Sequence, residues 1–179
     1  IPNMTVLAPS CYDEFVQMLD YAVNKCTGPV AVRYPKGNVS FRSGCKPFEV
    51  SVAEKICSGD DASLVACGKM TDIAVKAVQL LESRGIKCAL YNVGTVKPID
   101  ENALRDALSH TPLFTVEDNV TEGGMGSAVA SIAAETGAKC IKLGFPDEFI
   151  KQGKQKELFE LYGLTPSGIA ERIEREIHK

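Results

Sequence analysis

Two kinds of apolar pattern alternate along the chain. Short runs that are apolar throughout predict buried strands, and segments with apolar residues every three or four positions predict amphipathic helices. Strands are expected at residues 4–8, 30–32, 53–57, 63–67, 88–93, 113–116 and 140–143, and helices at residues 12–26, 70–81, 100–109, 126–136, 155–162 and 166–178. This alternation predicts an α/β fold with a mostly parallel sheet flanked by helices.

The pattern divides the chain into two parts. Residues 1–36 form a βαβ unit whose helix begins near Ser10, with Asp13 three positions on, close to a capping box. One such unit is too small to bury its own apolar surface, so its sheet neighbours are expected to lie outside this chain. Residues 37–52 are polar and rich in turn formers, which predicts an interdomain linker. Residues 53–179 then form the second domain.

Composition narrows the class of protein. The 179 residues include 20 Lys and Arg against 23 Asp and Glu, and 45% are hydrophobic, which is typical of a globular chain. A slightly acidic chain gives no electrostatic reason to expect nucleic-acid binding. No apolar run approaches the ~18 residues of a membrane helix. Because ordered sequence begins within three residues of Ile1, and without Met, we interpret the chain as part of a longer protein.

The seven cysteines are scattered and odd in number, and no C-x-x-C pair occurs. This spacing predicts neither a disulfide framework nor a zinc site. Most of these cysteines are expected to act as small apolar side chains in a reducing cytoplasm.

Arg33 is the strongest candidate for a binding residue. It directly follows the apolar strand at residues 30–32, at the carboxyl end where α/β proteins collect ligands. A guanidinium there can direct two N–H groups onto a phosphate or carboxylate, and Lys36 adds a second positive charge. The structural alternative is an exposed arginine paired with an acid on a helix.

A glycine-rich turn at Gly123–Gly126 invites comparison with dinucleotide-binding loops. However, its third position is Val129, and the carboxylates of Glu117, Asp118 and Glu122 would repel a pyrophosphate. A tight turn with close helix approach, at a domain or subunit interface, is the favoured interpretation. Glu117–Asp118 is expected in a solvated loop rather than in catalysis.

The two histidines offer no catalytic constellation. His110 follows a predicted helix and His178 lies next to the last residue, and neither has a nucleophile nearby in sequence. Both are expected to be surface or capping residues.

Several runs resemble the 1-deoxy-D-xylulose-5-phosphate synthase family of transketolase-like thiamine-diphosphate enzymes. Residues 1–9 and 28–37 (GPVAVRYPKG) are similar to the end of its pyrimidine-binding domain. The runs VKPID, TVEDN, GGMGS and YGLT are similar to its C-terminal domain. Residues 143–150 (LGFPDEFI), followed by Gln152–Gly153, are the most diagnostic, because GGMGS is shared across transketolase-like proteins. The resemblance covers essentially the whole chain.

The resemblance implies a transferase of isoprenoid, thiamine and pyridoxal precursor synthesis. It would condense pyruvate with glyceraldehyde 3-phosphate with loss of CO₂, using thiamine diphosphate and Mg²⁺ in a cytoplasmic homodimer. The resemblance also implies that Arg33 binds the phosphate of the substrate. It gives no role to Lys36, which stands where the family more often has an arginine. Because the family's metal, cofactor and catalytic residues would precede Ile1, this chain alone is expected to be inactive. Another transketolase-like transferase and a non-catalytic assembly subunit remain the alternatives.

Overall fold

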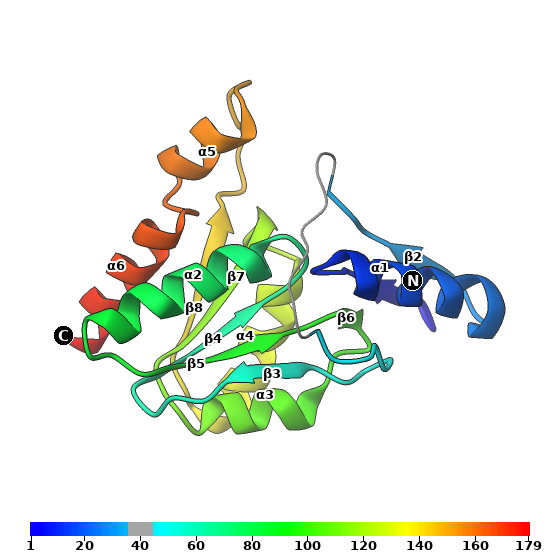
Figure 1. The fold of residues 1–179 in the computed structure, drawn as a ribbon, viewed down its shortest axis with the longest axis horizontal. Helices are drawn as coiled ribbons and strands as arrows, with labels where there is room; N and C mark the ends of the chain where they lie inside the picture. The colour runs from blue at the N-terminus through cyan, green and yellow to red at the C-terminus, as the bar shows by residue number, and fades with distance from the viewer. Residues whose placement is uncertain (36–44) are drawn as a thin grey trace.

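The computed structural model describes residues 1–35 and 45–179, and two β-sheets organise them (Figure 1). The larger sheet has the strand order β3–β5–β4–β7–β8. Its members are β3 (Glu54–Cys57), β4 (Ala62–Ala66), β5 (Cys88–Asn92), β7 (Leu113–Val120) and β8 (Cys140–Phe145). Only β3 pairs antiparallel with its neighbour, and the other pairs are parallel. The predicted α/β class with a mostly parallel sheet is confirmed.

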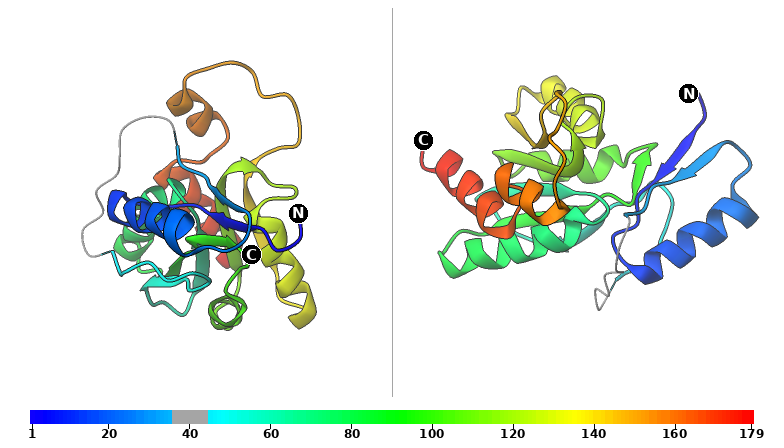
Figure 2. Two further views of the ribbon diagram at one scale, coloured as in Figure 1. Left: turned by 90° about the vertical axis from the view of Figure 1, so that its right-hand side faces the viewer. Right: turned by 90° about the horizontal axis from the view of Figure 1, so that it is seen from above.

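Helices cover both faces of this sheet. The helices α2 (Met70–Ser83) and α6 (Pro166–Ile177) pack on one face, and α3 (Glu101–Leu108) and α4 (Met125–Thr136) pack on the other (Figures 1 and 2). Alternate residues of one strand serve the two cores: Leu90 packs under α2, whereas Tyr91 packs under α3. The short helix α5 (Gln155–Leu161) lies beyond the carboxyl end of β8, and its Phe159 packs into the core on the α2 side.

The N-terminal segment, residues 1–35, is a βαβ unit beside the larger domain (Figure 2). It contains β1 (Thr5–Leu7), α1 (Tyr12–Asp20) and β2 (Val30–Val32), with β1 and β2 paired in parallel. As expected, the helical stretch continues beyond α1, but its last turn, η1 (Tyr21–Lys25), is π-helical.

One neighbour of this small sheet lies within the chain, which corrects the expectation that all of them lie outside. The strand β6 (Thr95–Lys97), which the apolar pattern did not predict, pairs antiparallel with β1. The sheet order is therefore β2–β1–β6, and the chain that follows β5 joins the N-terminal segment to the domain.

Polar side chains fix several helix starts. Asp100 accepts a hydrogen bond from Ala103 N at 3.1 Å, and Thr165 accepts one from Gly168 N at 3.2 Å. At the start of α1, the carboxylate that accepts a hydrogen bond from Ser10 N belongs to Glu14 and not to Asp13, because the N-cap residue is Cys11.

Part of the predicted linker can be followed. Residues 36–44, which include Lys36, lie outside the described residues. Beyond them the chain runs beside α1, where Phe48 N donates to Gln17 Oε1 at 2.8 Å. Within the described part of the chain, no helix combines the length and apolar character needed to cross a bilayer.

Candidate functional site at the seam between the two sheets

Arg33 stands where the sequence places it, directly after a strand. Its backbone N–H donates to Leu7 O at 2.7 Å, which continues the pairing of β2 with β1. The carboxyl end of β2 therefore fixes the position of the side chain.

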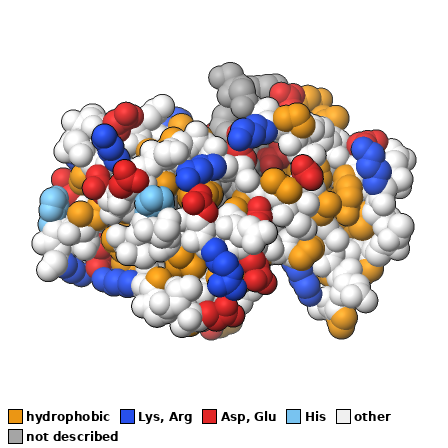
Figure 3. Space-filling view, turned by 90° about the horizontal axis from the view of Figure 1, so that it is seen from below, with side chains coloured by type: hydrophobic (Ala, Val, Ile, Leu, Met, Phe, Trp, Pro, Cys, Tyr) orange, Lys and Arg blue, Asp and Glu red, His pale blue; other side chains and the backbone are white. Residues whose placement is uncertain are grey.

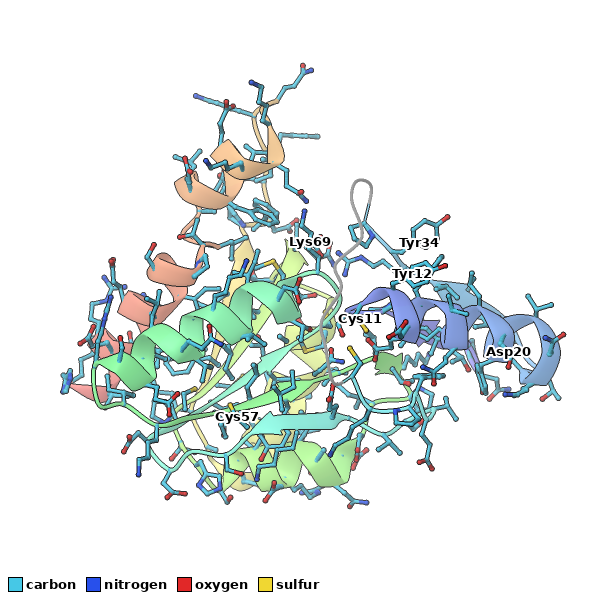
Figure 4. The ribbon with its side chains drawn as sticks, viewed as in Figure 1. Cys11, Tyr12, Asp20, Tyr34, Cys57 and Lys69 are labelled. Carbon is cyan, nitrogen blue, oxygen red and sulfur yellow. The ribbon has the colours of Figure 1, made fainter. Side chains whose placement is uncertain are left out.

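The two sheets meet at their carboxyl ends, along a line that we call the seam. Ala8 N, just after β1, donates to Gly94 O at 2.8 Å. A Cβ built on Gly68, which follows β4, would lie 3.8 Å from Pro9 O. Lys69 points from this turn along the same edge (Figure 4) and donates to Gln155 Oε1 at 2.5 Å. The seam thus joins the two edges at which an α/β protein collects ligands.

The Arg33 side chain crosses the seam to β7. Its Nη2 lies 2.6 Å from Asp118 Oδ1 and 3.1 Å from Asp118 O. The side chains of Arg33 and Asp118 are 42% and 19% exposed. The structure therefore pairs Arg33 with an acid of its own chain, as in the structural alternative, but the acid is on a strand and the guanidinium faces solvent.

Aromatic packing holds the residues after Arg33. The ring of Tyr34, labelled in Figure 4, lies 5.0 Å from the ring of Phe15 on α1. Tyr34 is nevertheless 62% exposed, so one face of this pair is open to solvent. This contact anchors the chain that leaves Arg33 to the helix of the same unit.

A buried polar cluster joins the N-terminal segment to the larger domain. Glu14 Oε2 accepts hydrogen bonds from Ser10 N at 2.6 Å and from Ser10 Oγ at 2.7 Å. Asn92 Nδ2, at the end of β5, donates to Glu14 Oε1 at 3.2 Å, and Thr71 Oγ1 donates to Asn92 Oδ1 at 2.9 Å. A side chain on Gly94 would collide with Glu14, so glycine is required there. This cluster therefore joins the start of α1 to the end of β5 and the start of α2.

The glycine-rich turn serves a carboxylate of the chain itself. Glu117 accepts hydrogen bonds from Met125 N at 3.1 Å and Gly126 N at 2.8 Å, at the start of α4. These are the amides that a bound pyrophosphate would need. The expectation of a solvated loop at Glu117 was wrong, because Glu117 is buried in β7 and its carboxylate is satisfied by these amides. The interpretation as a tight turn with close helix approach fits this geometry.

The histidines lie away from the seam. His110 precedes β7, at the amino-terminal end of the strand and so at the end of the sheet opposite the seam, and its Nδ1 lies 3.5 Å from Asp60 Oδ1. His178 follows the last turn of α6. Both positions fit the expected surface and capping roles.

The seam also contains a buried thiol. Burial raises the pKa of Cys67 to about 12, with Glu117 adding to the rise and Arg33 opposing it. A thiol with so high a pKa is not a nucleophile near neutral pH.

The described residues contain no cluster of acidic, Cys and His side chains large enough to hold a metal by itself. Within residues 1–35 and 45–179, no group of three or more His, Cys, Asp or Glu side chains could hold an ion. The amides at the start of α4 are occupied by Glu117. The prediction that the metal and the cofactor are bound by residues preceding Ile1 stays a prediction.

Comparison with known proteins agrees with this architecture. Residues 51–169 match the family described as transketolase, C-terminal domain. A split-gene transketolase, described as an inactive beta4 tetramer, superimposes with a TM-score of 0.86 at 29% identity, over 99% of this chain and 59% of that one. A transketolase mutant from Pichia stipitis has the same fold, with a TM-score of 0.77 at 24% identity over 99% of this chain and 25% of that one.

The chain belongs to the transketolase C-terminal domain family. Its curated relatives include 1-deoxy-D-xylulose-5-phosphate synthase 2 of Geobacter sulfurreducens, 38% identical over 97% of this chain, and the 1-deoxy-D-xylulose-5-phosphate synthase of Clostridium tetani, 36% identical over 97%. The chain covers 29% and 28% of these proteins, and it resembles their C-terminal part.

Proposed function

We propose that this chain is the C-terminal portion of a 1-deoxy-D-xylulose-5-phosphate synthase. The intact protein would condense pyruvate with glyceraldehyde 3-phosphate with loss of CO₂. The observation that carries the proposal is the match of 97% of the chain to synthases of that name. Arg33, at the carboxyl edge of a strand, supports it with a group suited to a phosphorylated substrate.

We assign Arg33 to the phosphate of glyceraldehyde 3-phosphate. Both contacts with Asp118 are made by one nitrogen, Nη2, and the side chain is 42% exposed. An exposed ion pair of this kind contributes only about 0–1 kcal/mol, so an incoming phosphate can compete for the guanidinium. Arg33 is thus a binding residue, and we assign no catalytic residue within the chain.

Thiamine diphosphate, held with Mg²⁺ mainly by an upstream portion of the protein, would supply the electron sink of the reaction. Among the described residues, Arg33 would bind the phosphate, and the buried cluster around Glu14 would hold the N-terminal segment that carries Arg33 against the larger domain. Because the cofactor and the metal would be held mainly by the upstream portion, we expect this chain to be inactive alone. The division of the chain into residues 1–36, 37–52 and 53–179 is part of the proposal. We also propose that the intact protein is a cytoplasmic homodimer.

The apolar surface of the N-terminal segment supports an upstream partner. Of the ten exposed large apolar residues in the described part of the chain, six lie in residues 1–34, and hydrophobic side chains also gather on this side in Figure 3. Val16 is 46% exposed and Val23 is 79% exposed along the helical stretch. A parallel strand pair normally has both faces covered. We propose that the upstream portion covers this helical face and extends the small sheet.

Reconstitution tests this function. This chain is supplied with the upstream portion, in one polypeptide or as a separate chain, and CO₂ release from pyruvate with glyceraldehyde 3-phosphate is measured. We expect turnover only when both portions, thiamine diphosphate and Mg²⁺ are present. Turnover by this chain alone, or none by the complete assembly, contradicts the proposal.

Two alternatives have distinct outcomes in that experiment. Another transketolase-like transferase would use a ketose phosphate as donor in place of pyruvate. A non-catalytic assembly subunit would bind the upstream portion without supplying any group to the substrate. The split-gene relative, described as an inactive tetramer, is the observation that favours considering the second alternative.

A further inference from the structure

Two cysteines that are far apart in sequence come together beside α1. The Sγ atoms of Cys11 and Cys45 lie 2.6 Å apart, although the residues are 34 positions apart. Cys11 is the residue before α1 and is labelled in Figure 4. Cys45 begins a stretch that runs beside this helix in the same direction, toward Gln17. The scattered spacing of the cysteines gave no sign of this pair.

A second contact fixes the register of the two segments. Phe48 N donates to Gln17 Oε1 at 2.8 Å, and the Phe48 ring lies 5.9 Å from the ring of Tyr21. Three residues of extended chain, from Cys45 to Phe48, span about 10 Å. Six residues of helix, from Cys11 to Gln17, span about 9 Å. The anchor at Phe48 therefore brings Cys45 level with Cys11.

The two cysteine residues differ in exposure. Cys45 is partly exposed, whereas Cys11 is 5% exposed. A small oxidant can therefore reach Cys45 first, and Cys11 lies in place as the second thiol.

We propose that Cys11 and Cys45 form an intrachain disulfide when a low-molecular-weight disulfide is present. The Cys45 thiolate attacks one sulfur of the reagent, which forms a mixed disulfide and releases one thiol. The Cys11 thiolate then attacks the Cys45 sulfur, and the second thiol of the reagent leaves. Two protein thiols are oxidised, and the reagent is reduced to two thiols.

The bridge closes a covalent loop that contains α1, β2 and Arg33. It ties the chain that follows Arg33 to the start of α1, beside the buried cluster of Ser10 and Glu14. The other cysteines provide a contrast. Cys67 and Cys88 are buried, whereas Cys26, Cys57 and Cys140 are partly exposed like Cys45. The Cys26 and Cys57 thiols donate to the carbonyl oxygens of Gly28 and Cys88, both at 3.5 Å. We therefore expect oxidation to link the pair whose sulfur atoms are in contact, Cys11 and Cys45.

Peptide mapping tests this proposal. The chain is treated with oxidised glutathione, quenched with acid, alkylated under denaturing conditions and digested with trypsin. Cys11, Cys26 and Cys45 fall in separate peptides, residues 1–25, 26–33 and 43–55. We expect peptide 1–25 linked to peptide 43–55, with a loss of two hydrogens, about 2 Da, in the intact chain. Cys26 should remain alkylated.

Two variants make the outcome decisive. Cys45→Ser should lose the linked peptide and accumulate no other bridge to Cys11, and Cys26→Ser should form the linked peptide as the wild-type chain does. The midpoint of thermal unfolding should rise on oxidation in the wild-type chain and in Cys26→Ser, and stay unchanged in Cys45→Ser. Separate glutathione adducts on Cys11 and Cys45, or random pairing among the cysteines, would overturn the proposal.

Discussion

The guanidinium of Arg33 lies 2.6 Å from the carboxylate of Asp118, 85 positions further along the chain. The two residues belong to different sheets, so this ion pair crosses the seam. Asp118 neutralises a cation at the edge where ligands collect, and both side chains keep contact with solvent. Arg33 is therefore held in place without being removed from the reach of an anion.

The buried cluster around Glu14 predicts a large loss of stability when its acceptor is removed. Glu14→Ala leaves Ser10 N and the Asn92 amide without this partner, which should lower the free energy of unfolding by about 2–4 kcal/mol. Urea denaturation measures the change. Asp13→Ala, at the exposed neighbouring acid, is the control and should cost at most about 1 kcal/mol. Equal losses for the two variants would show that the cluster does not hold the segment to the domain.

The start of α4 predicts a second structural effect. A Cβ at Gly126 would lie 2.7 Å from Thr115 Oγ1 and 3.0 Å from Glu117 Oε1. Gly126→Ala should therefore lower the free energy of unfolding by about 1–3 kcal/mol, as crowding in a packed interior does. Gly153→Ala meets only side-chain atoms at 3.4 Å or more and serves as the control. If Gly126→Ala unfolds like the control in thermal melts, the close approach is not required.

The carboxylate of Glu176 predicts a pH dependence of stability. Hydrogen bonds from Lys139 and Lys179 lower the pKa of Glu176 to about 2 from its usual 4.5. Because the pKa is lower in the folded state, the stabilisation is complete above about pH 4.5 and is lost as the pH falls toward about 2.

Thermal unfolding of the wild-type chain and Glu176→Gln across this range checks that dependence. The difference between their midpoints should be largest near neutral pH and should shrink below about pH 4.5. Glu160→Gln, at a more exposed acid 4.0 Å from Lys156, should show no such trend. A difference for Glu176→Gln that does not vary with pH would contradict the assignment.

Local patterns were sufficient for most of the larger domain. Apolar periodicity located α2, α4 and α6, and the caps at Asp100 and Thr165 lie where the side chains can accept amide hydrogen bonds. These features depend on neighbours within four residues, so the sequence alone contains the information.

The parts that sequence analysis missed depend on distant partners. The strand β6 has only three residues between Gly94 and Pro98 and is stabilised by pairing with β1. Glu117 is buried because amides eight and nine residues away satisfy its carboxylate. The acid that pairs with Arg33, and the sulfur that meets Cys11, also come from remote positions. No local pattern reports such pairings.

The acceptor preference of the reconstituted protein tests the proposed role of Arg33 most directly. The measured quantity is kcat/KM for glyceraldehyde 3-phosphate and for unphosphorylated glyceraldehyde. The loss of charge-assisted hydrogen bonds in Arg33→Ala is worth roughly 1.5–3 kcal/mol, which is about 10- to 100-fold for the phosphorylated acceptor. Arg84→Ala removes another half-exposed, ion-paired arginine at the far end of α2 and is the matched control.

We predict that Arg33→Ala lowers kcat/KM with glyceraldehyde 3-phosphate much more than with glyceraldehyde, and that Arg84→Ala lowers neither selectively. Equal losses with the two acceptors in Arg33→Ala would contradict the account and leave Arg33 a structural partner of Asp118.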